Sequence, residues 1–386
     1  MRLKIYLLLI TILFGILLLS YYLINNIEGF NKYNLKIVPI KPCGCEITNL
    51  NLVDTNYYLD NDLVKYLEFL MAKYGFILIR NQGKINNEKN IKGKYLTGKE
   101  QCIFSKNFGT KRLHSPHAVH DEAPNNDIFR LSNNEKHGFN SVGPEWHNDG
   151  SFEKNPFSYV IYHIIKAPEG YGNTKFAHLG KAYDKLDNSL KNRLENCASI
   201  NSNSNVIHPL VHKHPISNRK SLYLHLGMTG AIIENVNNKK KYIKTKFTDE
   251  ITPYYLPKYI KNINELKNIR CWRNKEMNKF FINISNLLDD KEVSYSHKWK
   301  EGDIIIIDNL AVAHKATKQA HDLKKGLRIL HRTTVESNNE LKPIKELQLE
   351  KKLDLNQENP FGKDSTWING YVGYRWGDWK NRSIPH

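Results

Sequence analysis

The sequence predicts a mainly β protein with flanking helices, in which a jelly-roll core is preceded by an N-terminal transmembrane helix. Three observations support this prediction. Short apolar runs rich in Val, Ile and Tyr recur between turn residues, as in the strands of a β-sandwich. Segments with helical periodicity are few, so helices are expected to cover the β core from outside. One long run without charges stands at the N-terminus.

Residues 5–24 contain no charged side chain and consist mainly of Leu and Ile. As a helix rising about 1.5 Å per residue, this run would cross the hydrocarbon core of a bilayer, which is roughly 30 Å thick. It exceeds the apolar region of a secretory signal, and Tyr21 and Tyr22 suit a membrane interface better than a cleavage site. We therefore expect residues 1–30 to be an uncleaved, single-pass membrane anchor.

The charges on either side of this run favour one orientation. Arg2 and Lys4 lie against its N-terminal end, whereas Glu28 is the first charge beyond its other end. Basic residues accumulate on the cytosolic side of membrane helices. The N-terminus is thus expected in the cytosol, with the remainder of the chain on the extracytosolic side.

The whole chain carries a net charge of +18, which raises the question of nucleic-acid binding. Lysine and asparagine are abundant throughout the sequence, including segments that we expect to be loops. No basic block with interleaved aromatic residues stands out, so we interpret the excess charge as spread over a solvated surface. Nucleic acid is therefore not expected to be a partner.

The rest of the chain divides into three parts. Residues 31–58 are polar and rich in Asn, which is typical of a spacer. Residues 59–340 contain the predicted helices and strands and are expected to form the main domain. Residues 341–386 form a C-terminal extension that is charged at first and then rich in Trp and Tyr, so its end is expected to dock on the core or to bind a partner.

The spacing of apolar residues predicts the secondary structure of the main domain. Helical periodicity predicts a helix over 59–73, with Asp60 or Asn61 as its N-cap, and further helices over 179–194 and 275–288. Strands are predicted at 74–80, 128–131, 146–152, 158–166, 221–226, 304–307 and 327–335, and a turn followed by a strand is predicted over 167–176. Residues 82–127 are polar, and their prolines favour a long loop.

His147 and Asp149 lie two residues apart in one of these predicted strands. Side chains two apart on a strand project from the same face, so the imidazole and the carboxylate would lie side by side. Two histidines and one carboxylate form the facial triad that holds non-haem Fe(II) and leaves three coordination positions open. The third ligand has to come from a distant segment, and His314 is the best candidate.

A second histidine-rich segment offers an alternative metal site. His114, His117 and His120 are spaced three residues apart, and Glu122 follows them. This spacing would suit zinc ligands on one face of a helix, but the prolines within and after the segment favour a loop, which could act as a lid. The chain has 16 histidines, so a histidine close to a carboxylate also arises by chance.

Four blocks of the sequence follow one another between about residue 75 and 335. They are Trp-His-Asn-Asp-Gly-Ser-Phe at 146–152; Gly-Asn-Thr at 172–174 with Ala-Tyr-Asp-Lys-Leu at 182–186; His-Pro-Leu-Val at 208–211 with His-Pro at 214–215 and Arg-Lys-Ser-Leu-Tyr at 219–223; and Trp299, Gly-Asp at 302–303, Asp-Asn at 308–309, His314 and Arg-Ile-Leu-His-Arg at 328–332. In this order the blocks resemble the taurine dioxygenase-like (TauD/TfdA) family of Fe(II)/2-oxoglutarate-dependent oxygenases. Asn173 stands where the family often has aspartate, and Arg219 lacks the glycine that often precedes it.

The resemblance implies a double-stranded β-helix, a variant of the jelly roll, and a dioxygenase reaction. It implies that Fe(II) is held by His147, Asp149 and His314, and that 2-oxoglutarate and dioxygen take the remaining positions. A small organic substrate would be oxidised while 2-oxoglutarate is converted to succinate and CO2. Family halogenases lack the carboxylate ligand, so the presence of Asp149 favours hydroxylation or a related oxidation.

The far carboxylate of 2-oxoglutarate needs a cation, and a guanidinium matches it best because its planar fork makes two hydrogen bonds. Arg328 lies 14 residues after His314, as in the family, and Thr174 would add a hydroxyl. Arg328 and Arg332 alternate onto one face of the last predicted strand, so Arg332 is expected to be a second cation at the pocket. Two roles for it remain open: contact with an anionic primary substrate, or a structural ion pair.

Two other functions are compatible with parts of this sequence. The same β core could be an inactive binding module at a membrane, which loss of a metal ligand would have indicated. A metal-dependent hydrolase could instead use the segment 114–122, and the identity of the bound metal would separate it from an oxygenase.

Overall fold

The computed structural model describes residues 33–52, 56–82, 96–109, 119–140, 142–201, 206–235 and 269–345 of the chain. The anchor expected at residues 1–30 lies outside the described residues, as does the C-terminal extension from residue 346 onwards. Among the helices that are described, none is both long and apolar enough to cross a membrane.

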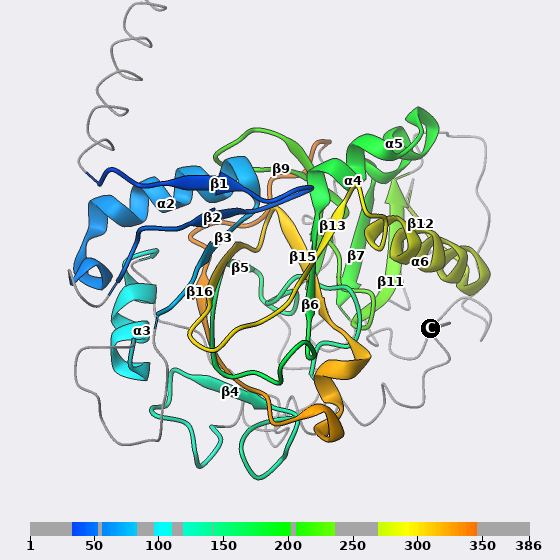
Figure 1. Ribbon diagram of the computed structural model, residues 1–386. Coiled ribbons are helices and arrows are strands. Elements are labelled where there is room, and N and C mark those ends of the chain that lie inside the picture. The colour runs from blue at the N-terminus through cyan, green and yellow to red at the C-terminus, as the bar shows by residue number, and fades with distance from the viewer. Residues whose placement is uncertain are drawn as a thin grey trace, which may run out of the picture.

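A seven-stranded sheet, the major sheet, forms one wall of the core (Figure 1). Its strands pair antiparallel except for the second and third, which are parallel. In sheet order they are β1 (Ile37–Pro39), β2 (Cys45–Ile47), β3 (Phe76–Ile79), β14 (Ile304–Asp308), β5 (Phe157–Lys166), β16 (Ile329–Glu336) and β4 (Phe129–Ser132).

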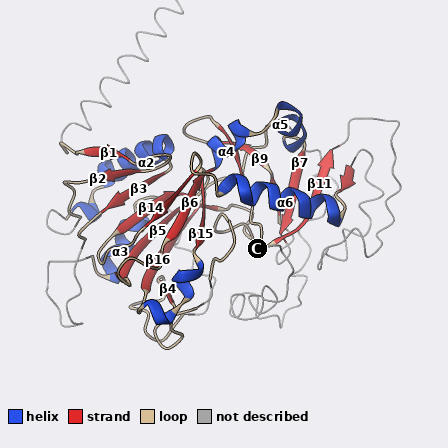
Figure 2. Ribbon diagram, turned by 45° about the vertical axis from the view of Figure 1, so that its right-hand side comes forward, coloured by secondary structure: helices blue, strands red, loops and turns tan. Residues whose placement is uncertain are grey.

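A three-stranded antiparallel sheet, the minor sheet, forms the opposite wall (Figures 1 and 2). Its strands, in sheet order, are β13 (Ser294–His297), β6 (Thr174–His178) and β15 (Val312–Ala316). An isolated antiparallel bridge between His147 and His314 adds the segment around His147 beside β15. The two walls make the mainly β jelly-roll architecture that the sequence predicts.

Two smaller sheets lie beside the minor sheet. One has four strands in the order β12 (Ile269–Cys271), β11 (Thr229–Asn235), β7 (Cys197–Asn201) and β8 (Ile207–Pro209). The other is a hairpin of β9 (Val211–Lys213) and β10 (Lys220–Leu222). The strand expected at 221–226 is therefore shorter, because the chain leaves the hairpin after Leu222.

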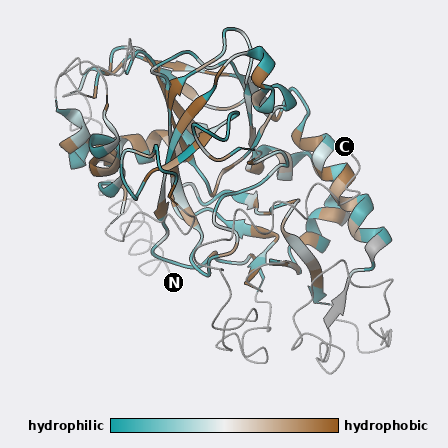
Figure 3. Cartoon of the chain, turned by 90° about the horizontal axis from the view of Figure 1, so that it is seen from below, coloured by the Kyte–Doolittle hydropathy of each residue, from teal (hydrophilic) through white to brown (hydrophobic). Residues whose placement is uncertain are grey.

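Successive side chains of β14 point to opposite faces of the major sheet, so this strand contributes to two hydrophobic clusters. Ile305 and Ile307 belong to the cluster between the two sheets, together with Phe176 of β6. Ile304 and Ile306 point to the other face of the major sheet and join the cluster with helix α2. Since both faces of β14 are covered, its sequence is a continuous apolar run rather than an alternating one. Figure 3 shows the apolar residues concentrated on such strands and the hydrophilic residues on the connecting loops.

The helices cover the outer faces of the two walls, as expected. Helices α2 (Asn61–Tyr74) and α3 (Gly98–Lys106) lie against the major sheet, whereas α4 (Leu179–Lys185), α5 (Asn188–Leu194) and α6 (Asn274–Leu288) lie on the side of the minor sheet (Figure 2). Asp60 caps α2 by accepting hydrogen bonds from the amides of Asp62 and Leu63. The residues that the periodicity assigned to its buried face are buried: Leu63, Val64, Leu67, Leu70 and Met71.

Three further local predictions, all outside the site, are wrong. Residues 37–47, placed in a spacer, contain β1 and β2, which extend the major sheet next to β3. The loop predicted over 82–127 contains α3, which begins with a capping box between Thr97 and Glu100. The helix predicted over 179–194 is two helices, because Asp187 caps a new helix after the first one ends.

Candidate metal centre

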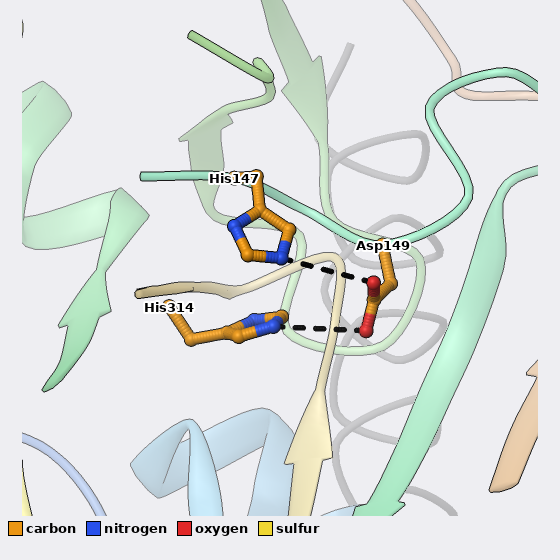
Figure 4. A group of neighbouring side chains, drawn as sticks. All are labelled: His147, Asp149 and His314. Atoms are coloured by element: carbon orange, nitrogen blue, oxygen red, sulfur yellow. Dashed lines mark ion pairs between the residues drawn. The ribbon is translucent and has the colours of Figure 1, made fainter. Parts of the chain in front are cut away.

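His147, Asp149 and His314 lie together between the two sheets and are all buried (Figure 4). Nε2 of His147 is 3.8 Å from Oδ1 of Asp149, and Nε2 of His314 is 3.6 Å from Oδ2 of the same carboxylate. One ligand atom from each residue lies within 4.8 Å of the other two. Three donors at this separation face a common point, as a facial triad requires.

The backbone brings the two distant histidines side by side. The amide of His147 donates to the carbonyl of His314 at 3.1 Å, and the amide of His314 donates back at 2.9 Å. The strand predicted over 146–152 does not form as a continuous element, however. Its assigned bridge is with His314, backbone hydrogen bonds join Trp146 to Leu226 and Asn148 to Leu224 on its other side, and the chain turns after Asp149. Gly150 allows that turn with a φ of +74°, and a Cβ there would come 2.7 Å from the ring of Phe157.

Asn148 and Asn309 hold this turn in place. Oδ1 of Asn309 accepts from the amide of Asp149 at 2.9 Å, and its Nδ2 donates to the carbonyl of Asp149 at 2.8 Å. Nδ2 of Asn148 donates to the carbonyl of Asn309 at 2.6 Å, and Oδ1 of Asn148 accepts from the amide of Leu224. Since both side chains are fully buried, these bonds are shielded from competing water.

The histidines are in the state that metal binding needs. Nδ1 of His147 lies 2.7 Å from the carbonyl of Glu145, and because a carbonyl only accepts, Nδ1 carries the proton and Nε2 keeps its lone pair. Burial lowers the pKa of His147 and lowers the pKa of His314 well below its usual value, so both imidazoles are neutral. Burial opposes ionisation of Asp149, but the Arg332 guanidinium, helped by the hydrogen bond from Tyr162, holds the pKa of its carboxyl below the usual range.

Arg332 and Tyr162 contact the same carboxylate from the major sheet. Nη1 of Arg332 donates to Oδ1 of Asp149 at 2.9 Å, and the hydroxyl of Tyr162 donates to Oδ2 at 3.2 Å. The Tyr162 hydroxyl is also 2.7 Å from Nε2 of His314. Of the two roles left open for Arg332, the ion pair is therefore present, while Nε of Arg332 has no partner among the described residues.

Arg328 lines the same pocket and is buried without a carboxylate partner among the described residues. Its Nη2 is 3.4 Å from Oγ1 of Thr174, and its Nε has no partner within the described part of the chain. Burial lowers the pKa of Arg328 to about 10, which leaves it a cation at neutral pH. A buried cation without a counter-ion favours an anionic ligand.

Thr174 is arranged to donate to that ligand. Nε1 of Trp299 donates to Oγ1 of Thr174 at 3.0 Å, and Arg328 approaches the same oxygen. With its lone pairs engaged by these two donors, the hydroxyl keeps its proton for an acceptor in the pocket. Gly172, which has a φ of +77°, leaves space here, since a Cβ would lie 3.2 Å from Cδ of Arg328.

These donors fit the groups that the sequence implies. Two neutral imidazoles and an ionised carboxylate suit Fe(II), and the pocket they line continues to Arg328 and Thr174. The separation of metal donors from the unpaired guanidinium suits a dicarboxylate that binds the metal at one end and the cation at the other. The pocket is lined by Leu131, Val142, Gly143, His147, Tyr162, Thr174, Trp299, His314, Ala316, Arg328, Leu330 and Arg332.

The alternative site at 114–122 is not assembled in the part of this segment that the structure describes. Glu122 is exposed and pairs with Arg130 and with His137. Nε2 of His120 lies 3.0 Å from the carbonyl of Glu135. His114 and His117 lie outside the described residues, and within those described the metal-type donors gather in one group of three, the triad above.

Sequence reasoning missed four residues at the site: Tyr162, His225, Trp299 and Asn309. The ring of His225 packs 4.9 Å from that of His147. Trp299 and Asn309 stand in the blocks that carried the family resemblance, but nothing in the sequence assigned them a partner. Tyr162 and His225 carry no local signal, since their roles depend on which strands become neighbours.

Comparison with known proteins agrees with this geometry. The sequence matches the family described as taurine catabolism dioxygenase TauD, TfdA family, over residues 36–334. The chain belongs to the TauD/TfdA family. The match covers all the strands of the major and minor sheets except the last two residues of β16, and it includes β1 and β2.

Individual TauD/TfdA relatives are distant. An alpha-ketoglutarate-dependent sulfonate dioxygenase of Saccharomyces cerevisiae is 26% identical over 228 residues, 53% of this chain and 52% of that protein. The chain thus matches about half the length of that relative. An alpha-ketoglutarate-dependent 2,4-dichlorophenoxyacetate dioxygenase of Cupriavidus pinatubonensis is 22% identical over 67% of this chain and 90% of its own length. A solved structure of a taurine dioxygenase from Burkholderia xenovorans covers 81% of this chain and 97% of its own at a TM-score of 0.56 and 20% identity, which shows the shared fold.

Proposed function

We propose that the chain is an Fe(II)- and 2-oxoglutarate-dependent dioxygenase that oxidises a small organic substrate and releases succinate and CO2. The observation that carries this proposal is one pocket with two chemically distinct ends. One end holds the buried donors of His147, Asp149 and His314, and the other holds the buried Arg328, which has no counter-ion among the residues that the structure describes. An inactive binding module would not need both ends intact.

Each group of residues in the pocket has a separate role in the proposed reaction. His147, Asp149 and His314 would hold Fe(II), and the co-substrate and dioxygen would bind beside them. Bound Fe(II) supplies the redox chemistry that couples decarboxylation of 2-oxoglutarate to oxidation of the substrate. Arg328 and Thr174 bind the far carboxylate and so orient the co-substrate. The apolar walls around them, including Leu131 and Leu330, exclude water.

The primary substrate is proposed to be a small anion. Arg332 lines the pocket, and its Nη1 donates to Asp149. Its Nε has no hydrogen-bond partner among the described residues and is available to a ligand. The relatives named above act, by their names, on a sulfonate and on a chlorinated phenoxyacetate, and both of these substrates are anions. A cation at the reaction end of the pocket would attract such a group.

The test is a screen for succinate formation by the purified chain with Fe(II), 2-oxoglutarate and dioxygen. Small sulfonates, carboxylates and sulfate esters are compared with uncharged alcohols of the same carbon skeleton. We expect at least one anion to stimulate succinate release well above the uncoupled rate, and its alcohol counterpart to fail. Stimulation by the alcohols alone would contradict the proposal of an anionic substrate but would still support a dioxygenase activity. Metal analysis that finds zinc as the active metal would favour the hydrolase alternative.

We also propose that residues 1–30 anchor the enzyme in a membrane, that the catalytic domain follows and includes β1 and β2, and that residues 341–386 are its extension. The support is the uncharged run at 5–24. The full chain is expected to sediment with membranes and to resist extraction by high salt, whereas a chain starting at Asn31 is expected to stay in the supernatant. Release of the full chain by salt would contradict the anchor. The flanking charges favour an extracytosolic catalytic domain, which protease protection in sealed vesicles would test.

A further inference from the structure

Tyr162 occupies a position that neither the sequence blocks nor the metal triad accounts for. It lies on β5 directly opposite Arg332 of β16, so both side chains project from the same face of the major sheet into the pocket. Its side chain is 4% exposed, and its ring meets that of His314 edge-on at 5.6 Å between centroids. The phenol is therefore a fixed part of the wall beside the metal donors.

This cross-strand pair holds both oxygens of one carboxylate. Arg332 donates to Oδ1 of Asp149 at 2.9 Å, and the Tyr162 hydroxyl donates to Oδ2 at 3.2 Å. Two donors on different oxygens fix the plane of the carboxylate. In that plane Oδ1 lies 3.8 Å from Nε2 of His147, and Oδ2 lies 3.6 Å from Nε2 of His314.

We propose that Tyr162 is a positioning residue of the metal centre, which keeps the Asp149 carboxylate turned towards the two imidazoles and away from a two-pronged pairing with Arg332. This inference rests on the proposed function, because it concerns the same metal. A guanidinium prefers to bind both oxygens of a carboxylate through its planar fork. Such a pairing would engage both oxygens with Arg332 and would turn the carboxylate from the imidazoles. The hydroxyl of Tyr162 opposes that rotation by holding Oδ2.

The hydroxyl of Tyr162 lies within hydrogen-bond distance of two metal-binding residues. It is 2.7 Å from Nε2 of His314 and 3.2 Å from Oδ2 of Asp149. When the lone pair of Nε2 is given to a metal, that nitrogen no longer bonds to the hydroxyl. The single phenol proton then serves Asp149 alone. Partners of metal ligands act in this way, and their removal typically weakens metal binding by about 10- to 100-fold.

The experiment measures metal affinity and needs no turnover. Fe(II) is titrated anaerobically into the metal-free protein, and Co(II) is used in parallel because its visible absorption reports the ligand geometry. Wild type is compared with Tyr162→Phe, which removes one oxygen and keeps the ring. The matched control is Tyr159→Phe on the same strand. Tyr159 is equally buried but belongs to the cluster on the other face of the sheet, where it is hydrogen-bonded to Glu68.

We expect Tyr162→Phe to bind Fe(II) about 10- to 100-fold more weakly and to shift the Co(II) spectrum. Tyr159→Phe is expected to match wild type in both. A Tyr162→Phe protein that binds Fe(II) as tightly as wild type would overturn this inference alone. Tighter binding would overturn it too and would mean that the hydroxyl competes with the metal for its place. A wild-type chain that binds no Fe(II) would refute the proposed function and this inference with it.

Discussion

Asn309 holds the backbone of Asp149 from both sides. Its Oδ1 accepts from the Asp149 amide at 2.9 Å, and its Nδ2 donates to the Asp149 carbonyl at 2.8 Å and to the carbonyl of Phe157 at 2.7 Å. The residue next to β14 thus sets the backbone of a metal ligand that lies 160 positions earlier in the chain. The side-chain amide of Asn309 therefore fixes the position of Asp149 without contacting the carboxylate oxygens that would bind the metal.

Asn309→Ala removes all three of these buried bonds. Each contributes about 1 kcal/mol, and the groups left unpaired add a further cost, so we expect the free energy of unfolding to fall by about 2–4 kcal/mol. Urea denaturation followed by circular dichroism measures this change. Asn338→Ala, at an exposed position, is the control and is expected to change stability by less than about 0.5 kcal/mol. Equal stability of the two variants would show that the three bonds do not hold the turn.

Arg328→Ala is expected to weaken 2-oxoglutarate binding by roughly a hundredfold or more, while Fe(II) binding stays close to that of wild type. The reason is that a carboxylate buried without its cation loses several kcal/mol, and each 1.4 kcal/mol is about tenfold in affinity. Arg328→Lys should recover only part of the loss, because an ammonium keeps the charge but not the paired geometry. Isothermal titration with 2-oxoglutarate in the presence of Mn(II) measures these affinities.

Thr174→Ala is expected to cost less, about 1 kcal/mol, because it removes one neutral hydrogen bond to the co-substrate. The same titration measures it. Thr174→Ser keeps the hydroxyl between Trp299 and Arg328 and is the matched control, with affinity close to wild type. If Thr174→Ser were as weak as Thr174→Ala, the hydroxyl would not be the group that matters.

His178 predicts an acid sensitivity of the fold away from the metal. Its Nδ1 accepts the amides of Gly180 and Lys181 and so caps α4. Burial, with Arg219 and Lys181 nearby, lowers the pKa of His178 to about 4. Because the folded-state pKa lies below the unfolded value of about 6.5, its contribution to stability is complete above pH 6.5 and is lost as the pH falls towards 4.

His178→Asn keeps a capping side chain but cannot take up a proton. Between pH 6.5 and 4 we expect its stability to fall less steeply than that of wild type, by up to about 1.4 kcal/mol per pH unit. Urea denaturation at several pH values gives the two slopes. Parallel curves for the two proteins would contradict the assignment of this titration to His178.

The elements that the sequence predicted well are those whose own residues determine their burial. Helix α2 and strands β3, β5, β14 and β16 have an apolar pattern that matches one or two covered faces. The three triad residues could also be predicted, because their spacing and the family blocks marked them. The structure brings them together as expected.

The features that could not be predicted depend on tertiary neighbours. The segment 146–152 was predicted as a strand, yet its backbone pairs only around His147, with His314 on one side and Leu224 and Leu226 on the other, and Gly150 turns the chain away. β1 and β2 have three residues each, too few to show a pattern, and they join the sheet because β2 pairs with β3 and β1 pairs with β2. The capping box of α3 at Thr97 and Glu100 was a readable signal, but it lies in a long polar segment whose prolines, at 116 and 124, favoured a loop. Tyr162 acquired its role from the register between β5 and β16.

The most direct test of the metal centre and its co-substrate is one anaerobic absorption measurement. Fe(II)-loaded protein is titrated with 2-oxoglutarate, and the metal-to-ligand charge-transfer band that forms when a 2-oxo acid chelates iron is recorded. Wild type is compared with His314→Ala and with His120→Ala, a histidine of the alternative segment. We predict a saturable band in wild type and in His120→Ala, and none in His314→Ala. A band that persists in His314→Ala, or that is lost in His120→Ala, would contradict the account.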